Sequence, residues 1–113
     1  MPYIEAKLSV NLDENQKNDL QVKLTDAVSN SFSKPKAYIM TCIDDGKSLY
    51  MAEKNLEKGA YISVSLLGSA SKSVCQNLTG EICKILSNYG INGSNVYITY
   101  HPVDLWGWNG SMF

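Results

Sequence analysis

The sequence has no long apolar run, since no stretch approaches the roughly 20 residues that a membrane span requires. The N-terminal segment also lacks a charged stretch followed by an apolar one, so no secretory signal is expected. We therefore expect a cytoplasmic protein that, if it is secreted, leaves the cell without a signal peptide. An excess of charge is missing as well: the net charge of -1 gives no reason to expect nucleic acid or a membrane as a partner.

Cysteine and histidine are scarce, and their spacing argues against a metal site. Cys42, Cys75 and Cys83 form an odd set without a Cys-x-x-Cys pair, which opposes both a disulfide framework and a zinc site. Cys75 and Cys83 are compatible with buried thiols on one side of a helix. The sole histidine, His101, stands beside Pro102 and is expected in an exposed loop rather than as a catalytic base. We expect no metal and no cofactor.

A chain of 113 residues is long enough for a single domain, 1–113, and its first half reads as strand, helix and strand. Alternating apolar side chains predict the first strand, and Asp13 followed by Gln16 resembles the capping box of a helix. Pro35 ends that helix. The expected elements are a strand over 2–10, a helix from 13 to about 33, a strand over 37–43, a turn over 44–46 and a short return strand over 48–51.

The second half repeats this order about 57 residues later. Gly68 breaks its first strand, Ser69 or Ser71 is placed to cap its helix, and Gly90 is a stop signal for that helix. The expected elements are a strand over 60–67, a helix whose apolar face spans 74–89, a strand over 96–101 and a short strand within the aromatic tail, 106–113.

Two repeated units of this kind predict an α/β (α+β) fold. A helix that crosses over between two strands makes those strands parallel, and two such β-α-β units can share one four-stranded mixed sheet with both helices on one face. The other face then has no helical cover. It would carry polar residues such as Glu5 and Lys7 together with Tyr61 and Leu67, which fit bulk solvent poorly. The sequence therefore predicts self-association.

Pro2 opens the first strand and is the most informative residue of the chain. Once Met1 is removed, its secondary amine is free. Burial among apolar side chains or a nearby cation lowers the pKa of such an amine. A neutral amine on a rigid strand can then act as a proton-transfer base near neutral pH. The alternative is that Met-Pro is a chance beginning without catalytic purpose.

Several short motifs follow one another in a specific order. They are Pro2 at the start of the first strand, Ser33-Lys34-Pro35, Tyr38-Ile39-Met40, Leu67-Gly68, Val96-Tyr97-Ile98-Thr99-Tyr100 and the closing Gly107-Trp108-Asn109-Gly110-Ser111-Met112-Phe113. With these motifs the chain resembles the macrophage migration inhibitory factor family, within the tautomerase superfamily, over nearly its whole length. The resemblance implies a homotrimer in which three four-stranded sheets form a barrel with the helices outside.

The resemblance also implies a keto–enol tautomerase that acts on aryl 2-oxo acids of the phenylpyruvate or dopachrome type, with Pro2 as the base. By position, Lys34 would bind the substrate's carboxylate or carbonyl and lower the pKa of the amine, and the N–H of Leu67 would add a hydrogen bond. The remaining substrate-binding residues would be Tyr97 from the neighbouring subunit, Thr99, and the aromatic side chains of Tyr38, Trp106, Trp108 and Phe113.

Structural roles remain open for these residues. Lys34 follows a helix end, where the helix dipole stabilises a cation in any protein. Tyr97 in a strand is equally suited to a core or an interface. Trp106 and Trp108 could pack the tail on a neighbour.

The sequence departs from the family pattern in three places. Ala52-Glu53-Lys54-Asn55 replaces a glycine pair and an aromatic residue in a loop expected near the pocket. Thr99 replaces a common asparagine. The Cys-x-x-Cys pair of the vertebrate cytokines is absent, since the matching stretch is Gly59-Ala60-Tyr61-Ile62, so no thiol redox activity is expected.

A second class of function also remains open. The resemblance allows a cytokine-like ligand, or a mimic of one, that acts through its surface on a cell-surface receptor. In that case the pocket would be vestigial or inactive, on a trimer that serves as a scaffold.

Overall fold

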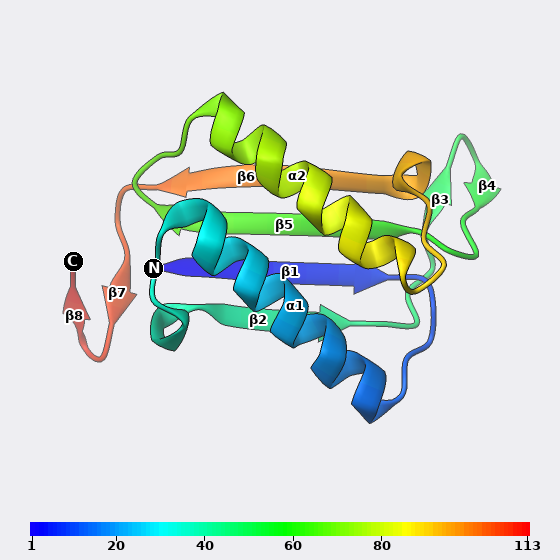
Figure 1. The fold of residues 1–113 in the computed structure, drawn as a ribbon, viewed down its shortest axis with the longest axis horizontal. Coiled ribbons are helices and arrows are strands. Elements are labelled where there is room, and N and C mark those ends of the chain that lie inside the picture. Colours follow the sequence, from blue (N-terminus) through cyan, green and yellow to red (C-terminus); the bar gives the residue numbers. More distant parts are fainter.

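The computed structural model describes residues 1–113 and shows a four-stranded sheet with two helices on one of its faces (Figure 1). The main elements are β1 (Pro2–Leu8), α1 (Glu14–Phe32), β2 (Met40–Asp44), β5 (Ala60–Leu67), α2 (Lys72–Ser87) and β6 (Val96–Val103). The strands lie in the order β2-β1-β5-β6. β1 is parallel to β2 and β5 is parallel to β6, whereas β1 and β5 meet antiparallel. The predicted pair of β-α-β units in one mixed sheet is confirmed.

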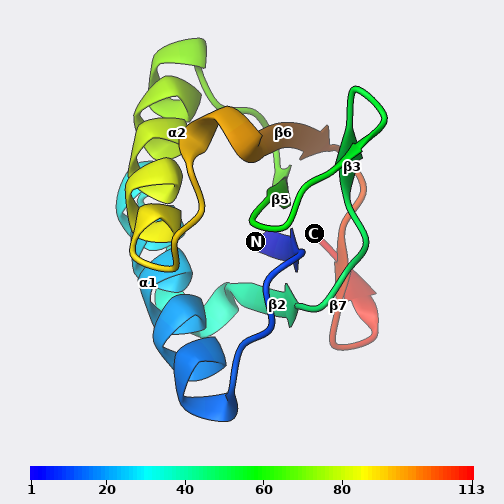
Figure 2. The same cartoon turned by 90° about the vertical axis from the view of Figure 1, so that its right-hand side faces the viewer.

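Two short hairpins complete the fold, and both stand on the side of the sheet opposite the helices (Figure 2). One consists of β3 (Tyr50–Met51) and β4 (Lys54–Asn55), the other of β7 (Gly107–Trp108) and β8 (Ser111–Met112). They lie at opposite ends of the sheet, with the β7–β8 hairpin beside the N-terminus (Figure 1). The sheet face without helices is therefore flanked by a hairpin at each end.

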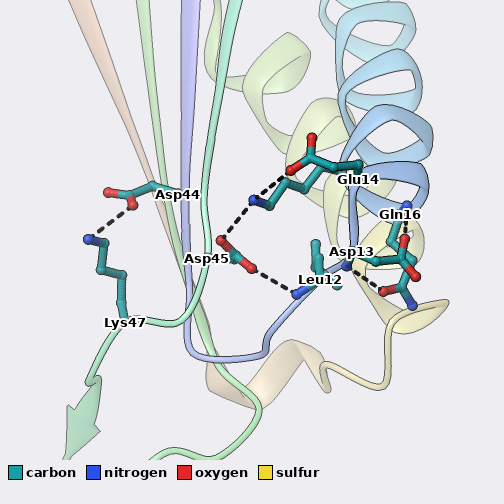
Figure 3. A network of polar contacts seen from close by, with 8 residues as sticks. Leu12, Asp13, Glu14, Gln16, Asp44, Asp45 and Lys47 are labelled. Atoms are coloured by element: carbon teal, nitrogen blue, oxygen red, sulfur yellow. Dashed lines mark hydrogen bonds and ion pairs between the residues drawn. The ribbon is translucent and has the colours of Figure 1, made fainter.

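Polar contacts at the start of α1 tie that helix to the turn after β2 (Figure 3). The predicted capping box is present: Asp13 accepts a hydrogen bond from the N–H of Gln16 at 2.8 Å, and its own N–H donates to the Gln16 side chain at 3.0 Å. Asp45 accepts a hydrogen bond from the N–H of Leu12 at 2.8 Å and lies 3.5 Å from the ammonium of Lys17. Asp45 thus holds the exit of β2 against the entry to α1.

The core lies between the helices and the sheet and contains 15 buried apolar side chains. Every second residue of β5 points into it, as expected of a strand with one covered face. The helices contribute residues three and four positions apart, among them Leu20, Leu24, Val28, Leu78, Ile82 and Leu86. The alternate residues of β1 and β5 remain partly exposed on the face without helices.

Three predicted strand boundaries were wrong. The strand expected over 2–10 ends at Leu8, and residues 9 and 10 lie in the bend that follows it. The strand expected over 37–43 begins only at Met40, because Lys36–Tyr38 forms a turn of 3-10 helix. Pro35, with its fixed φ, begins that turn, and its carbonyl accepts a hydrogen bond from the N–H of Tyr38 at 3.1 Å. The strand expected over 96–101 continues to Val103 as β6, so His101, expected in an exposed loop where that strand ends, is exposed but lies within the strand.

Smaller expectations were also resolved. The return strand expected over 48–51 shrinks to β3, which pairs only with β4 and does not join the main sheet. Ser71 rather than Ser69 caps α2. All three cysteines are free thiols. Neither helix combines the length and the hydropathy that a membrane crossing demands.

Candidate active site

A hollow of about 720 Å³ opens at the N-terminal end of β1. Nine of its 12 lining residues are hydrophobic. Most of the lining comes from β1, from the segment that joins α1 to β2, and from the tail, and β2, β5 and β6 contribute Met40, Ser65 and Val103. Four residues predicted for the site meet here, namely Pro2, Tyr38, Trp106 and Trp108. The fold thus brings both ends of the chain to one apolar site.

Another hollow, of about 780 Å³, lies between α1 and α2. Only three of its 11 lining residues are hydrophobic, and none of them was predicted for the site. Apolar surroundings lower the pKa of an amine, because desolvation disfavours its charged form. We therefore place the candidate active site in the hollow at Pro2.

Pro2 is fully buried and is the first residue of β1. It lies opposite Leu66 in the antiparallel pairing with β5, while Tyr3, the next residue, pairs with Met40 of β2. Proline is suited to the first position of a strand, where its missing N–H removes no ladder hydrogen bond. Strands on both sides hold β1, so the Pro2 ring has a fixed orientation.

The surroundings of the N-terminus lower the pKa of its amine. Burial in the hollow lowers the pKa of the Met1 amine below its usual range, and the charge of Lys34 lowers it further. Lys34 itself is exposed and does not line the hollow. Ser29 fixes its backbone twice, because the Ser29 carbonyl accepts the Lys34 N–H at 3.1 Å and the Ser29 hydroxyl donates to the Lys34 carbonyl at 2.6 Å.

Leu67 is also placed beside the N-terminus, although its side chain does not line the hollow. Its backbone N–H donates a hydrogen bond to the carbonyl oxygen of Met1 at 3.1 Å. The donor that the family resemblance assigns to a substrate oxygen therefore already holds an oxygen while Met1 is attached. Removing Met1 frees both this donor and the amine of Pro2.

Aromatic rings form one wall of the hollow. Tyr38 meets Trp108 edge to face, and Trp108 stacks on Phe113 with ring centroids 6.2 Å apart. The N–H of Phe113 donates to the carbonyl of Trp106 at 3.0 Å, which closes the β7–β8 hairpin. The hairpin turns at Asn109-Gly110, where both residues have positive φ, as the tightest hairpin turns require. Phe113 thus supports the wall without lining the hollow itself.

Tyr97 and Thr99 lie outside this hollow. Tyr97 pairs with Tyr61, which pairs with Lys7, so Tyr97 lies five residues along the sheet from Pro2, or about 16 Å. By the same register Thr99 lies three residues away, about 10 Å, and two strands across. Tyr97 is 66% exposed. Within one chain, neither residue can share a substrate with Pro2.

The loop at Ala52–Asn55 also lies elsewhere. It forms the turn and second strand of the β3–β4 hairpin, at the end of the sheet remote from the N-terminus (Figure 1). Within one chain it does not border the hollow at Pro2.

Several lining residues were not predicted from the sequence. They are Met1, Tyr3, Ala37, Ile39, Met40, Ser65, Val103 and Gly107. Tyr3 and Ser65 are directly opposite each other in the β1–β5 register, one residue from Pro2 and Leu66. Once Pro2 is placed opposite the end of β5, this register follows, so Tyr3 and Ser65 could have been predicted from the sequence.

The solved structures that resemble the chain share its entire fold. MIF2 of Leishmania major has a TM-score of 0.92 at 24% identity, covering 100% of this chain and 97% of that one. A macrophage migration inhibitory factor homologue from Prochlorococcus marinus has a TM-score of 0.88 at 29% identity, covering 98% of each chain. A fused 4-OT described as a symmetric trimer has a TM-score of 0.84 at 18% identity, covering 97% and 94%. The chain thus has the fold of the MIF and tautomerase structures.

The model of the macrophage migration inhibitory factor (MIF) family matches residues 1–113. The chain therefore belongs to that family. No curated protein matches the sequence at a significant level.

Proposed function

We propose that the protein is a keto–enol tautomerase of aryl 2-oxo acids, with the amine of Pro2 as the proton-transfer base. The observation that carries this proposal is the position of Pro2, fully buried, in a hollow with aromatic walls. The charge of Lys34 reaches the amine of the adjacent Met1 and lowers its pKa. Membership of the family supports the class of reaction. The flat apolar rings that line the hollow suit an aryl group, and this supports an aryl 2-oxo acid as the substrate.

In this mechanism the neutral amine of Pro2 removes a proton from the carbon beside the keto group. The electron pair of that C–H bond becomes the enol double bond, and the ammonium returns the proton to the carbonyl oxygen. Lys34 pairs with the substrate carboxylate. The N–H of Leu67, which is bonded to the Met1 carbonyl while Met1 is attached, donates to the same carboxylate. The apolar walls disfavour the charged form of the amine and so favour the neutral form that acts as the base.

We further propose that the working form is a homotrimer. β2 and β6 are edge strands with unpaired backbone groups on their outer sides, and the sheet face between the two hairpins has no cover. The distance between Tyr97 and Pro2 in one chain supports a site to which a neighbouring subunit contributes Tyr97 and Thr99. The fused 4-OT of the same fold is described as a symmetric trimer.

The N-terminus provides the sharpest test. Mass spectrometry first establishes which samples begin at Met1 and which at Pro2. We expect the processed protein to tautomerise phenylpyruvate and the Met1-bearing protein to be slower by about 10²–10⁴-fold, because acylation removes the base. A Pro2→Gly protein serves as the matched control, since it keeps an amine at the same place. Equal rates from both N-termini would disprove the proline mechanism and favour a surface ligand with an inactive pocket.

A further inference from the structure

The tripeptide Asn-Gly-Ser occurs twice in the chain, and the structure holds its two copies very differently. One begins at Asn92, just before β6, and the other begins at Asn109, in the turn between β7 and β8. Asparagine followed by glycine is prone to spontaneous deamidation, because glycine has no side chain to hinder attack by its own backbone nitrogen. The reaction needs an accessible carboxamide and a segment that is free to change its dihedral angles.

Asn92 is held in place on both sides. Its Oδ1 accepts hydrogen bonds from the N–H of Ser94 at 3.1 Å and from the Ser94 hydroxyl at 3.2 Å. Its carbonyl oxygen accepts the N–H of Asn95 at 2.9 Å. Ile91, directly before it, is fully buried in the core. Opening this segment would therefore break hydrogen bonds and disturb core packing.

Asn109 lacks these restraints. Asn109 and Gly110 are both exposed, and no hydrogen bond within the chain holds the Asn109 carboxamide or the Gly110 N–H. The hairpin around them consists of only two residue pairs, and its Trp108 and Phe113 side chains remain 54% and 57% exposed. A segment with so few buried contacts opens at little cost. In the open hairpin the Gly110 nitrogen can rotate toward the Asn109 side chain.

We propose that Asn109 is a site of spontaneous deamidation, and that this modification loosens the aromatic wall of the hollow. The Gly110 nitrogen loses its proton and bonds to the carboxamide carbon of Asn109. The C–N bond of the carboxamide breaks, and ammonia leaves with that proton. Water then opens the five-membered imide. Opening at the main-chain carbonyl gives isoaspartate, whose backbone runs through the former side chain, and opening at the other carbonyl gives aspartate.

Isoaspartate lengthens the backbone of a turn that is defined by two residues at φ 52° and 79°. The lengthened turn no longer matches the pairing of Trp108 with Ser111 across the hairpin. Trp108 lines the hollow, meets Tyr38 and stacks on Phe113, so its displacement opens the wall. The functional consequence rests on the function proposed above: the modified protein loses part of its preference for aryl 2-oxo acids.

Ageing of the processed protein in mildly alkaline buffer tests the site. Peptide mapping by mass spectrometry follows the gain of one mass unit at each asparagine and separates isoaspartate from aspartate. We expect Asn109 to convert at least about ten-fold faster than Asn92, because its segment opens at lower cost. In urea, where both segments are unfolded, the two rates should converge. Conversion of Asn92 at an equal or higher rate in the folded protein overturns the assignment.

Two variants separate the possible causes of a change in the wall. Asn109→Gly is the matched control, because Gly-Gly suits the same left-handed turn and has no carboxamide. Aged Asn109→Gly should keep its mass at this position and its substrate preference. Asn109→Asp adds the charge without lengthening the backbone, so it should leave the hairpin closed.

The wall is followed by two measurements. The ratio of kcat/KM for phenylpyruvate to that for pyruvate should fall by about 2- to 10-fold as isoaspartate accumulates, the worth of an aromatic contact. In a Trp106→Phe background Trp108 is the only tryptophan, so its fluorescence reports the opening of the hairpin without turnover. If Asn109 converts while both readouts stay at the values of aged Asn109→Gly, the effect on the wall is overturned. If fresh processed protein turns over neither acid, the tautomerase proposal fails, and mass and fluorescence still decide this one.

Discussion

Tyr38 and Trp108 meet edge to face, with ring centroids 5.9 Å apart and planes at 89°. One follows α1 and the other lies in β7, so the contact joins the two halves of the chain directly beside Pro2. Aromatic pairs of this geometry contribute about 0.5–1.5 kcal/mol beyond the area they bury. The wall that receives a substrate ring is thus also a structural contact between the halves.

The processed protein should prefer phenylpyruvate to pyruvate in kcat/KM by roughly 10- to 100-fold, because the ring buries apolar area that a methyl group lacks. Trp108→Ala should reduce this preference. Leu105→Ala is the matched control, since Leu105 lies in the same tail, is 80% exposed and does not line the hollow. Equal efficiency with both acids would show that the aromatic residues serve packing alone.

Lys34→Ala should shift the rate of the processed protein toward higher pH. Lys34 lowers the pKa of the Met1 amine, and a like charge acts in the same direction on the amine of Pro2, one residue along. Its removal therefore raises the pKa of that amine, and the pH at which the base becomes neutral rises with it. The pH–rate profile measures the midpoint. Lys36→Ala provides the control, because Lys36 is also exposed but is already paired with Asp26 at 2.6 Å. A midpoint that moves in Lys36→Ala and not in Lys34→Ala contradicts the assignment of Lys34 as the charge that lowers the pKa of the amine.

A site shared between subunits predicts complementation. A Tyr97→Ala protein supplies an intact Pro2, and a chain that retains Met1 supplies an intact Tyr97. When equal amounts are unfolded, mixed and refolded, roughly a quarter of the interfaces in a ring should regain both partners and with them activity. Light scattering should give three times the 12.5 kDa of one chain. A mixture no more active than its parents, or a monomer at micromolar concentration, would rule out the shared site.

Glu53→Gly should stabilise the protein by about 1 kcal/mol, because a left-handed backbone is costly for a residue with a side chain. Ala52 and Glu53 form the turn of the β3–β4 hairpin at φ 50° and 65°. Urea denaturation gives the free energy of unfolding. Lys54→Gly, one residue later in β4, is the control and should be neutral or destabilising. A loss of stability with Glu53→Gly would mean that the carboxylate makes a favourable contact there.

Stability should fall in acid partly through Asp45. The hydrogen bond from the N–H of Leu12, and after it the charge of Lys17, hold the pKa of Asp45 below its ordinary value of 3.8. The folded protein therefore binds fewer protons than the unfolded chain, so this contribution is present above about pH 4 and is lost as pH falls through the folded pKa. Asp45→Asn should give a flatter denaturation profile below pH 4. An unchanged slope contradicts this role.

The strands with the plainest alternation were the most predictable. Ala60–Leu67 was placed without error because all four inward positions are apolar and Gly68 follows directly. The start of β2 was missed since Ala37 and Tyr38 look like strand residues, while Pro35 imposes a turn that depends on the path back from α1. The capping box was predicted correctly because it depends only on Asp13 and Gln16, which are three residues apart.

Site residues that belong to a family motif could be predicted from the sequence. Site residues that reach the hollow only through strand pairing could not. Pro2 and the tryptophans were expected, whereas Ser65 and Met40 enter the hollow only because they pair with Tyr3 on either side of β1. His101 looked like a loop residue because Pro102 follows it. A proline is tolerated at the edge of a sheet, and β6 is an edge strand.

The central position of β1 has a consequence for biosynthesis. Once the sheet is assembled, Pro2 is fully buried and the Met1 carbonyl is bonded to Leu67, so the Met1–Pro2 bond is not in the extended, accessible segment that a peptidase cuts. On the proposed mechanism, Met1 has to leave while the chain is being made, before β5 has emerged to pair with β1. Timing at the ribosome, rather than the stability of the folded protein, would then determine the fraction of molecules with a free base.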